Sequence, residues 1–562
     1  MGPSDFKKPS PPGKRPYSSI LFPDEASIKN RDKIGSKLDA IRPQYEGGVR
    51  IYAPMPDVLV ASPDVIHPMS GNEIPVISSG GGRSNDLACR IGVAYGDGPN
   101  AVVVVDLVND ILYRIRDDLN SKRFRRLCAA RALDSIERIV QGGSFADESQ
   151  FGGITFSNKG IYFEVEFNNK VAEGKSGLTD EERILWALYR LQEAIGNQDR
   201  IRVVSENVQI RIKAMKMGLL AEGCRYESVE DHRLVYAPPK KIVAPPALFS
   251  VLSSEGRVSL EAVCEANGHK VDSYHSNGLV QVHPDPDQPD LSIFTLMQDG
   301  FLRASRYSGL SFANKLIAEH QSRQEKDDRS VSDSGIFSIS VNPDIEYAPK
   351  QMAYLDLLLD PSLLVVSAVG PSGTGKSECA LLAGLMLTSD RVHSQVIYTR
   401  ILPENRQDRL DDQSDLCPVW ARSARQDLRR IFRNRRSPDP IAYRDEVNQH
   451  VDFLKERGII DYVYQDDLPN LVEDAFWIVD GAHYSTREEI KDILYRVGSN
   501  TKLVLLGDPS KIIEGWTSSI TVANCGLTHV MDRLIGDRQY ACVTFLPNDV
   551  VKGPGADLAR LL

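Results

Sequence analysis

The chain lacks features that mark several classes of protein. None of its eight cysteines forms a Cys-x-x-Cys pair, which argues against a local zinc knuckle or a disulfide framework and favours a reducing compartment. No apolar run approaches the ~18 residues of a membrane span, and the first residues carry no apolar signal core. These absences predict a cytoplasmic protein without a membrane segment.

An excess of positive charge is also missing. The chain has 67 Lys and Arg against 77 Asp and Glu, a net charge of -10, so contact with nucleic acid would need a local basic groove. Hydrophobic residues make up 41% of the 562 positions, which predicts packed domains and excludes wholesale disorder. At about 150 residues per domain, three or four domains are expected.

Shifts in composition predict where the domains begin and end. Residues 1–40 open with a run rich in Pro, Ser and Lys, which predicts a flexible tail. Proline-rich and charged stretches at 236–246 and 321–335 are typical of linkers. The domains are therefore expected at 41–236, 246–320 and 336–562.

Local patterns give the first two domains different characters. In 41–236, strands expected at 101–105 and 202–204 alternate with helices expected at 119–140 and from Thr179, which has Glu182 three residues on. Alternating strands and helices predict an α/β domain. In 246–320, short apolar runs at 248–252, 279–282 and 292–295 are separated by turn residues and predict a small β-rich domain.

The third domain carries the strongest motif. An apolar run over 363–369 is followed by Gly-Pro-Ser-Gly-Thr-Gly-Lys-Ser at 370–377 and then by a helical pattern. This order is typical of a P-loop, in which Lys376 reaches the β- and γ-phosphates of ATP and the Ser377 hydroxyl ligates Mg²⁺. The alternative, a chance Gly-rich turn, is disfavoured by the flanking strand and helix. The expected nucleotide-binding residues of the loop are Gly370, Gly373, Thr374, Gly375, Lys376 and Ser377.

Two further apolar runs end in aspartate. The run 475–479 ends at Asp480, and the run 502–506 ends at Gly507-Asp508. Besides the hydroxyl of the P-loop, the metal needs a carboxylate from the end of another strand. We expect Asp480 to be that ligand. Asp508 would lie beside the γ-phosphate. For each aspartate, the alternative is an ordinary turn at the end of a strand.

With these motifs the C-terminal domain resembles the PhoH-type ATPases, relatives of superfamily 1 helicases. The matching phrases, in order, are 351–360, 397–400, 476–483, 494–498, 507–511 and 548–552. The resemblance implies a P-loop NTPase (RecA-like) fold, ATP with Mg²⁺, and a homo-oligomeric ring. It also implies that Gln351 binds the adenine edge and that Arg496 lies near the phosphates with a catalytic role, beside Asp480 and Asp508.

The first domain resembles a PIN domain, a ribonuclease fold that uses Mg²⁺ or Mn²⁺. The segments that carry this resemblance are 102–140, 179–185 and 203–218. The chain as a whole thus resembles PIN–PhoH fusions, which couple an ATPase to unwinding and cleavage of RNA.

The catalytic positions depart from both families. Gly481 stands where the PhoH ATPases have the Glu that polarises the attacking water, His483 replaces a Gln, and Lys511 replaces another. Loss of a positioned base costs about 10²–10⁴ in rate, so weak or absent hydrolysis is expected. Gly481→Glu should then raise turnover, unless Gly481 holds a backbone angle that Glu cannot adopt.

The acids of the PIN-like domain are displaced or substituted as well. Met55 stands at the family's leading Asp, and the candidate metal ligands are Asp57, Asp110, Glu181 and Glu206. Two metal ions need several converging carboxylates. The alternative is four ordinary surface acids on an inactive scaffold.

Two arginine-rich stretches begin at Arg123 and at Arg429. Each is either a solvated helix face or a contact for single-stranded RNA. The second lies in a segment, 404–465, to which the resemblance transfers no role.

Three functions remain open. The first is an ATP- and RNA-binding protein with weakened ATPase and little nuclease activity. The second is an active ATP-dependent RNA helicase and ribonuclease. The third is a structural or regulatory module locked by ATP. The rate of ATP hydrolysis discriminates between these functions.

Overall fold

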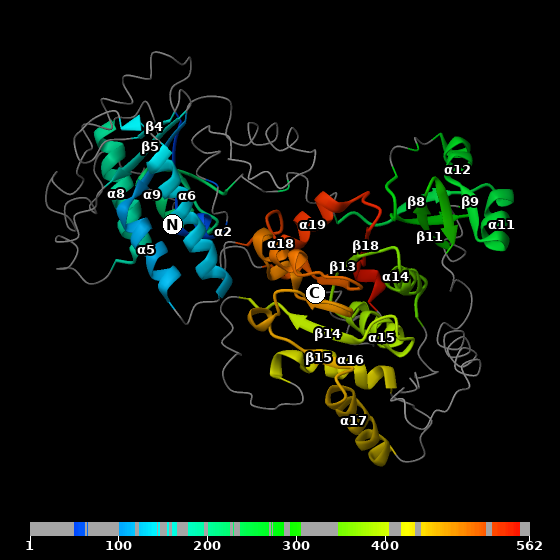
Figure 1. Cartoon of the computed structure of the whole chain (residues 1–562). Helices are drawn as coiled ribbons and strands as arrows, with labels where there is room; N and C mark the ends of the chain where they lie inside the picture. The colour runs from blue at the N-terminus through cyan, green and yellow to red at the C-terminus, as the bar shows by residue number, and fades with distance from the viewer. Residues whose placement is uncertain are drawn as a thin grey trace, which may run out of the picture. The chain divides into compact units, whose positions relative to one another are not determined.

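The computed structural model describes a large part of the chain. The described residues are 50–61, 65, 100–118, 123–142, 144–145, 154–156, 160–165, 178–195, 201–224, 229, 236–268, 271, 274–285, 293–304, 347–403, 418–432, 440–512 and 520–550. They belong to two compact units, one of residues 1–228 with 514–519 and one of residues 229–513 with 520–562 (Figure 1). The predicted tail, residues 1–40, lies outside the described residues.

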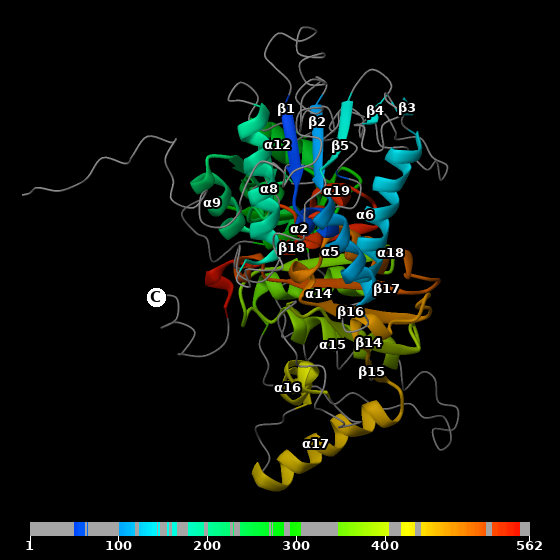
Figure 2. The ribbon, with the colours of Figure 1, turned by 90° about the vertical axis from the view of Figure 1, so that its left-hand side faces the viewer.

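The first unit contains a mixed sheet in which five neighbouring strands run parallel. The strand order is β3-β4-β5-β2-β1-β6-β7, and β4 is antiparallel to both of its neighbours. The strands are β1 (Arg50–Pro54), β2 (Asn100–Val105), β3 (Ser144–Phe145), β4 (Ile154–Phe156), β5 (Gly160–Val165), β6 (Ile201–Val204) and β7 (Leu220–Glu222). Figure 2 shows β1, β2 and β5 side by side. Residues 102–105 are buried, as expected for a strand inside a parallel sheet.

Helices complete this unit and largely match the predicted α/β pattern. They are α2 (Pro56–Ala61), α5 (Asp106–Asp117), α6 (Arg123–Gly142), α8 (Asp180–Ile195) and α9 (Val208–Met217). The strands predicted at 101–105 and 202–204 are confirmed. The capping box is confirmed too, because the Glu182 N–H donates to Thr179 Oγ1 and the Thr179 N–H donates to the Glu182 carboxylate. α5, directly after β2, was not predicted.

The middle part of the chain is built on a five-stranded sheet, which includes strands at the predicted runs 279–282 and 292–295, and it also contains two helices. It consists of β8 (Lys240–Val243), α11 (Pro246–Glu255), β9 (Arg257–Ser259), α12 (Leu260–Asn267), β10 (Leu279–His283), β11 (Ile293–Gln298) and β12 (Phe301–Ala304). The strand predicted at 248–252 is wrong, since these residues lie in α11. Pro246 occupies the first turn of that helix, where proline is favoured, and Gly256 ends it in a left-handed conformation.

The C-terminal part is built on a six-stranded parallel sheet. The strands are β13 (Val365–Val369), β14 (Gln395–Arg400), β15 (Ile460–Tyr462), β16 (Ala475–Asp480), β17 (Lys502–Gly507) and β18 (Tyr540–Thr544), in the order β15-β14-β16-β17-β13-β18. The helices are α14 (Pro349–Leu359), α15 (Lys376–Ser389), α16 (Arg422–Phe432), α17 (Pro440–Glu456), α18 (Arg487–Tyr495) and α19 (Gly526–Leu534). A parallel sheet of this kind agrees with the predicted P-loop NTPase-like fold.

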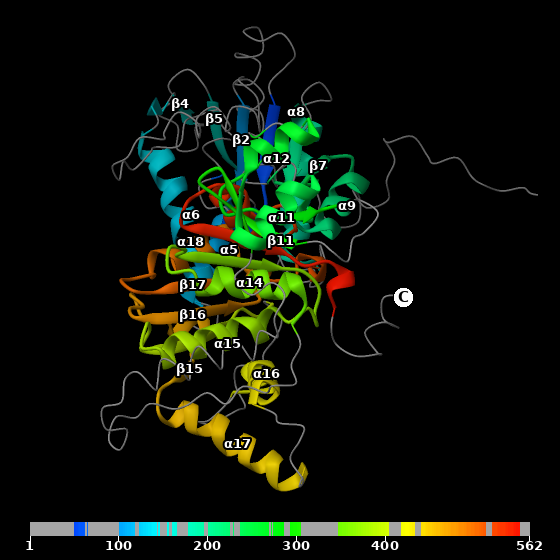
Figure 3. The same cartoon turned by 90° about the vertical axis from the view of Figure 1, so that its right-hand side faces the viewer.

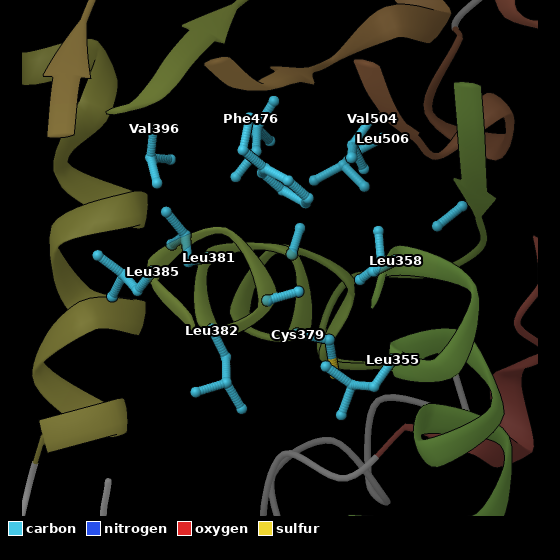
Figure 4. Packing of buried hydrophobic residues seen from close by; sticks show 14 of the residues in the cluster. Leu355, Leu358, Cys379, Leu381, Leu382, Leu385, Val396, Phe476, Val504 and Leu506 are labelled. Atoms are coloured by element: carbon cyan, nitrogen blue, oxygen red, sulfur yellow. The ribbon is translucent and has the colours of Figure 1, made fainter. Parts of the chain in front are cut away.

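Both faces of this sheet are buried, which explains the continuous apolar runs in the sequence. Val366 and Ala368 of β13 face one core cluster, and Val365 and Val369 face the other. α14 and α15 contact each other on the first side (Figure 3). Figure 4 shows the strand residues Val396, Phe476, Val504 and Leu506 on one side of α15 and the α14 leucines Leu355 and Leu358 beside it.

The carboxyl ends of four strands meet at one edge of the sheet. Val369 pairs with Gly507, Arg400 pairs with Asp480, and Asp480 pairs with Leu506. Ligands of open parallel sheets bind at this edge, where neighbouring strands are not consecutive in the chain. The P-loop, Asp480 and Asp508 all follow strands that end here.

Among the described residues, no helix combines the length and apolarity needed to cross a bilayer.

Candidate nucleotide-binding site

The loop after β13 needs its glycines. Gly370, Gly373 and Gly375 have φ values of 139°, 91° and 83°, which side chains rarely tolerate. A Cβ on Gly370 would lie 2.3 Å from the Phe545 carbonyl oxygen, and one on Gly375 would lie 2.3 Å from Gln351 Nε2. Space and backbone angle therefore restrict Gly370 and Gly375 to glycine, and backbone angle favours glycine at Gly373, as a phosphate-binding loop requires.

Lys376 and Ser377 open α15 directly behind the loop. The Lys376 ammonium donates to the carbonyl oxygens of Gly370 and Pro371, each at 2.7 Å, so it lies over the first half of the loop. Thr374 is buried, and its hydroxyl donates to the Pro371 carbonyl oxygen at 3.0 Å. The positive end of the helix dipole and the lysine thus face the same space, an arrangement suited to phosphate.

Gln351 braces the loop from α14. Its Oε1 accepts from the Ala348 N–H at 2.8 Å, and its Nε2 donates to the Thr374 carbonyl oxygen at 2.9 Å. The side chain is 3% exposed. These bonds give Gln351 a structural role under the loop, and its contact with adenine stays a prediction.

Asp480 ends β16 in the same pocket as Ser377. The Tyr398 hydroxyl donates to Asp480 Oδ2 at 2.7 Å, and Arg400 Nε lies 3.9 Å from the same oxygen. Burial keeps the pKa of Tyr398 well above its ordinary value, so the tyrosine is a fixed donor. It orients the carboxylate that would hold a metal.

His483 and Asp508 form a second polar pair at this edge. The Asp508 N–H donates to His483 Nδ1 at 3.1 Å, so the imidazole hydrogen lies on Nε2. Burial lowers the pKa of His483 to about 3, and nearby cations add to this effect; they are Lys511, Lys376 and Arg400. His483 is therefore neutral at pH 7, and its basic nitrogen is already occupied.

Gly481 has no room for a side chain. Its φ is +79°, and a Cβ would lie 2.4 Å from the Ile401 carbonyl oxygen. Of the two expectations for Gly481→Glu, the structure favours the second, in which the backbone excludes glutamate. The backbone at position 481 therefore requires glycine, and glycine supplies no base for hydrolysis.

α16 forms a wall of the pocket that sequence reasoning missed. The pocket has a volume of about 370 Å³, and α16 contributes Ser423, Gln426, Asp427 and Arg430 to it. Arg430 Nη1 lies 3.0 Å from the carboxylate of Glu378, whose side chain is 5% exposed. Arg400 donates to Ser423 Oγ at 2.9 Å. The apolar spacing of Ala424, Leu428 and Ile431 was the available signal.

Arg496 does not reach the phosphate edge of its own chain. Its guanidinium donates to the carbonyl oxygens of Leu468 and Pro469, at 2.8 and 2.9 Å, and to Asp492. Its own carbonyl accepts from the Val472 N–H, just before β16 begins. Since Asp480 ends that strand, Arg496 lies at the opposite edge of the sheet, which corrects the expectation within one chain.

Two of the four candidate acids in the first unit, the half-buried Asp57 and the buried Glu206, are committed to the fold. Asp57 Oδ2 accepts from Ser205 Oγ at 2.8 Å and from the Glu206 and Asn207 N–H groups, and burial raises the pKa of Asp57. Glu206 Oε1 accepts from the Cys224 N–H at 2.9 Å. These two are not the surface acids of the alternative interpretation.

The described residues of this region do not assemble a metal site. Asp110 and Glu181 are exposed on α5 and α8. Arg211 donates to the Ser205 and Glu206 carbonyl oxygens, which puts a positive charge beside the acids. Asp57 Oδ1 is buried without a partner among the described residues, yet one free oxygen does not hold two divalent ions. Among the described residues, no group of three or more His, Cys, Asp or Glu is arranged to bind a metal.

Comparison with known proteins gives the family of the C-terminal part. Residues 345–559 match the PhoH-like protein family, so this part of the chain is a PhoH domain. The chain is similar to "Protein PhoH2" of Bacillus subtilis, with 27% identity over 390 residues that cover 68% of this chain and 77% of the relative. That match is too long to lie within residues 229–562, so it extends into the first unit.

Two shorter matches have the same name. "Protein PhoH2" of Thermobispora bispora is 30% identical, and that of Mycolicibacterium smegmatis is 29% identical, each over 202 residues. Each match covers 35% of this chain and 42% of the relative. The chain therefore matches less than half the length of these two proteins.

Proposed function

We propose that the chain binds ATP with Mg²⁺ through its PhoH domain and hydrolyses the nucleotide slowly or not at all. The observation that carries this proposal is the convergence of Lys376, Ser377 and Asp480 on one pocket that also contains Gly481. The first three supply what triphosphate binding needs. The fourth has neither a side chain nor space for one.

The oxygens present fit Mg²⁺. The Ser377 hydroxyl and the Asp480 carboxylate are the hard ligands that this ion prefers, with phosphate oxygens and waters completing its shell. Tyr398 holds one of the two oxygens of Asp480 and fixes the carboxylate's orientation. Bound Mg²⁺ would neutralise part of the phosphate charge.

Slow hydrolysis follows because neither position 481 nor His483 offers a base next to Asp480. Gly481 offers no carboxylate, and His483 cannot take a proton at Nδ1 because that atom accepts from the Asp508 N–H. Without a positioned base, a loss of about 10²–10⁴ in rate is expected. Either a module locked by ATP or a weak ATPase fits this site better than a fast helicase motor.

The wider functions rest on the resemblance. Single-stranded RNA as a partner, a PIN-like first unit with little cleavage, and a cytoplasmic location stay proposals. A homo-oligomeric ring also stays a proposal, because the Arg496 guanidinium donates to carbonyl oxygens of its own chain.

Lys376→Ala tests the nucleotide site. It removes the ammonium but leaves the strand, loop and helix, so ATP affinity should fall at least tenfold, or about 1.4 kcal/mol. Calorimetric titration with ATP·Mg²⁺ measures this, and Lys491→Ala, at a lysine 43% exposed on α18, is the control. An unchanged dissociation constant for folded Lys376→Ala would defeat the proposal, and brisk turnover by the wild type would defeat its slow-hydrolysis part.

A further inference from the structure

We infer that Lys511 is a second lysine for the γ-phosphate, through which the site prefers ATP to ADP. The inference rests on the proposed function, since it concerns the same pocket. Lys511 ends a short turn, Pro509–Lys511, that follows β17. Its ammonium lies 2.9 Å from the hydroxyl of Ser372, the third residue of the P-loop. A residue 139 positions later in the chain thus contacts the loop directly.

The position of Ser372 in the P-loop indicates which phosphate Lys511 would contact. In a P-loop the backbone N–H groups surround the inner phosphates. The lysine of the Gly-Lys-Ser/Thr sequence extends to the β- and γ-phosphates. Lys376 supplies that lysine, and its ammonium lies on the Gly370 and Pro371 carbonyl oxygens. Ser372 is the next residue. The two ammonium groups therefore converge on the same part of the loop, which is where the outer phosphates bind.

The charges around this point favour an additional anion. Lys511 and Lys376 both lie close enough to His483 to lower its pKa, with burial as the larger cause. Lys511 is 3.8 Å from Asp508 Oδ2, a loose ion pair, and its side chain is 47% exposed. A weakly paired, half-exposed lysine has the freedom to turn from Ser372 to a phosphate oxygen.

The expected difference between the affinities for ATP and ADP follows from how far each nucleotide extends along the loop. ADP ends at the β-phosphate, which Lys376 and the loop amides serve, whereas only ATP brings a charged group to the point between Ser372 and Lys511. Lys511 would thus form a charge-assisted hydrogen bond with ATP and none with ADP. Because the contact forms with the bound nucleotide before any reaction, it raises affinity for ATP without supplying a base.

Titration with ATP·Mg²⁺ and with ADP·Mg²⁺ tests the inference on the full chain. In Lys511→Gln and Lys511→Ala, ATP affinity should fall about tenfold, and ADP affinity should stay within twofold of the wild type. Lys511→Arg keeps the charge and should retain most of the preference for ATP. Lys491→Ala, the exposed lysine of α18, should leave both affinities unchanged. Thermal unfolding of each variant confirms that it is folded.

Two outcomes separate this inference from the proposed function. If the wild type binds neither nucleotide, the proposed function fails. If Lys376→Ala weakens both nucleotides while Lys511→Gln and Lys511→Ala leave the ratio of ATP to ADP affinity unchanged, the pocket is real and the role of Lys511 is wrong. An equal loss of ATP and ADP affinity in the Lys511 variants would also overturn it.

Discussion

Gly481 and Gly458 share a left-handed backbone but differ in surroundings. Their φ values are +79° and +67°; a Cβ on Gly481 would lie 2.4 Å from the Ile401 carbonyl oxygen, whereas a Cβ on Gly458 would meet nothing within 4 Å. Gly458→Ala should therefore cost only the left-handed conformation, about 1–2 kcal/mol. Gly481→Ala should cost about 1–3 kcal/mol more because of the clash.

Urea denaturation measures both free energies of unfolding. Gly481→Glu is expected to behave like Gly481→Ala, with lowered stability and no gain in turnover. Equal losses for Gly481→Ala and Gly458→Ala would show that the loop relaxes around a side chain. A stable Gly481→Glu protein with raised turnover would restore the simpler explanation, in which only the carboxylate is missing.

His529 makes the stability of the PhoH domain sensitive to acid. Burial lowers its pKa from 6.5 to about 3, with Arg487 and Arg533 adding to the effect. Between these values the unfolded chain binds a proton that the folded chain does not, so the free energy of unfolding falls as the pH drops from about 6.5 towards 3. At pH 5 the loss from this residue is about 2 kcal/mol.

His529→Gln should remove that part of the pH dependence. The difference in the free energy of unfolding between pH 7.5 and pH 5 is expected to be smaller by about 2 kcal/mol than in the wild type. Urea titrations at the two pH values measure it, with His275→Gln at an exposed position as the control. An unchanged difference in His529→Gln would mean that the folded protein also takes up the proton.

At the scale of elements, sequence patterns were most informative where only one structure fits them. β13 is a run of apolar residues followed by glycines, and the buried strand and the P-loop were both predicted. Thr179 and Glu182 marked the start of α8 in the same way, because a capping box is a local arrangement.

The elements that were missed have weaker local signals. The run Leu248–Leu252 is apolar without a clear period, and such a run fits a buried helix as well as a strand; the two prolines before it were the better guide. α16 has no family motif, and only its contacts with Glu378 and Arg400 make it part of the site. Those contacts span about 20 to 50 residues of chain, which no local pattern reports.

The pair between Arg430 and Glu378 joins α16 to the helix behind the P-loop. Glu378 is 5% exposed in its side chain, whereas Arg430 is 44% exposed. Removal of the arginine leaves a buried carboxylate without its cation, which should cost about 1–3 kcal/mol. Arg430→Ala should therefore lower the free energy of unfolding and weaken ATP binding, because the wall of the pocket loosens.

Arg429→Ala is the matched control, since Arg429 is the exposed neighbour on the same helix. Urea denaturation and ATP titration provide the two measurements. If the pair is responsible, Glu378→Gln should rescue part of the stability lost in Arg430→Ala, because the uncompensated charge is gone. Equal effects of Arg430→Ala and Arg429→Ala would show that the pair contributes nothing specific.

At the scale of the molecule, the two units differ in how many of the residues expected at their functional sites are in place. The PhoH domain keeps a complete phosphate-binding loop, while the first unit is an α/β scaffold in which Asp57 and Glu206, two of the four candidate acids, serve the fold. In that unit the carboxyl ends of β1 and β6 meet where the strand order reverses, the usual place for a ligand in such a sheet. Asp57 and Glu206 lie there, but backbone N–H groups already occupy an oxygen of each.

The first unit is therefore expected not to cleave RNA. Incubation of the full chain with single-stranded RNA in Mn²⁺ or Mg²⁺ should give no products above background, because Arg211 supplies a positive charge beside Asp57 and Glu206 while Asp110 is exposed on a separate helix. Asp110→Ala and Lys376→Ala, tested in parallel, assign any cleavage that does occur. Products that disappear in Asp110→Ala but persist in Lys376→Ala would come from a live metal site in the first unit, and the argument from its buried acids would then be wrong. Products that persist in both variants and resist chelation of the metal would point to a contaminating nuclease, since a two-metal mechanism requires the ions.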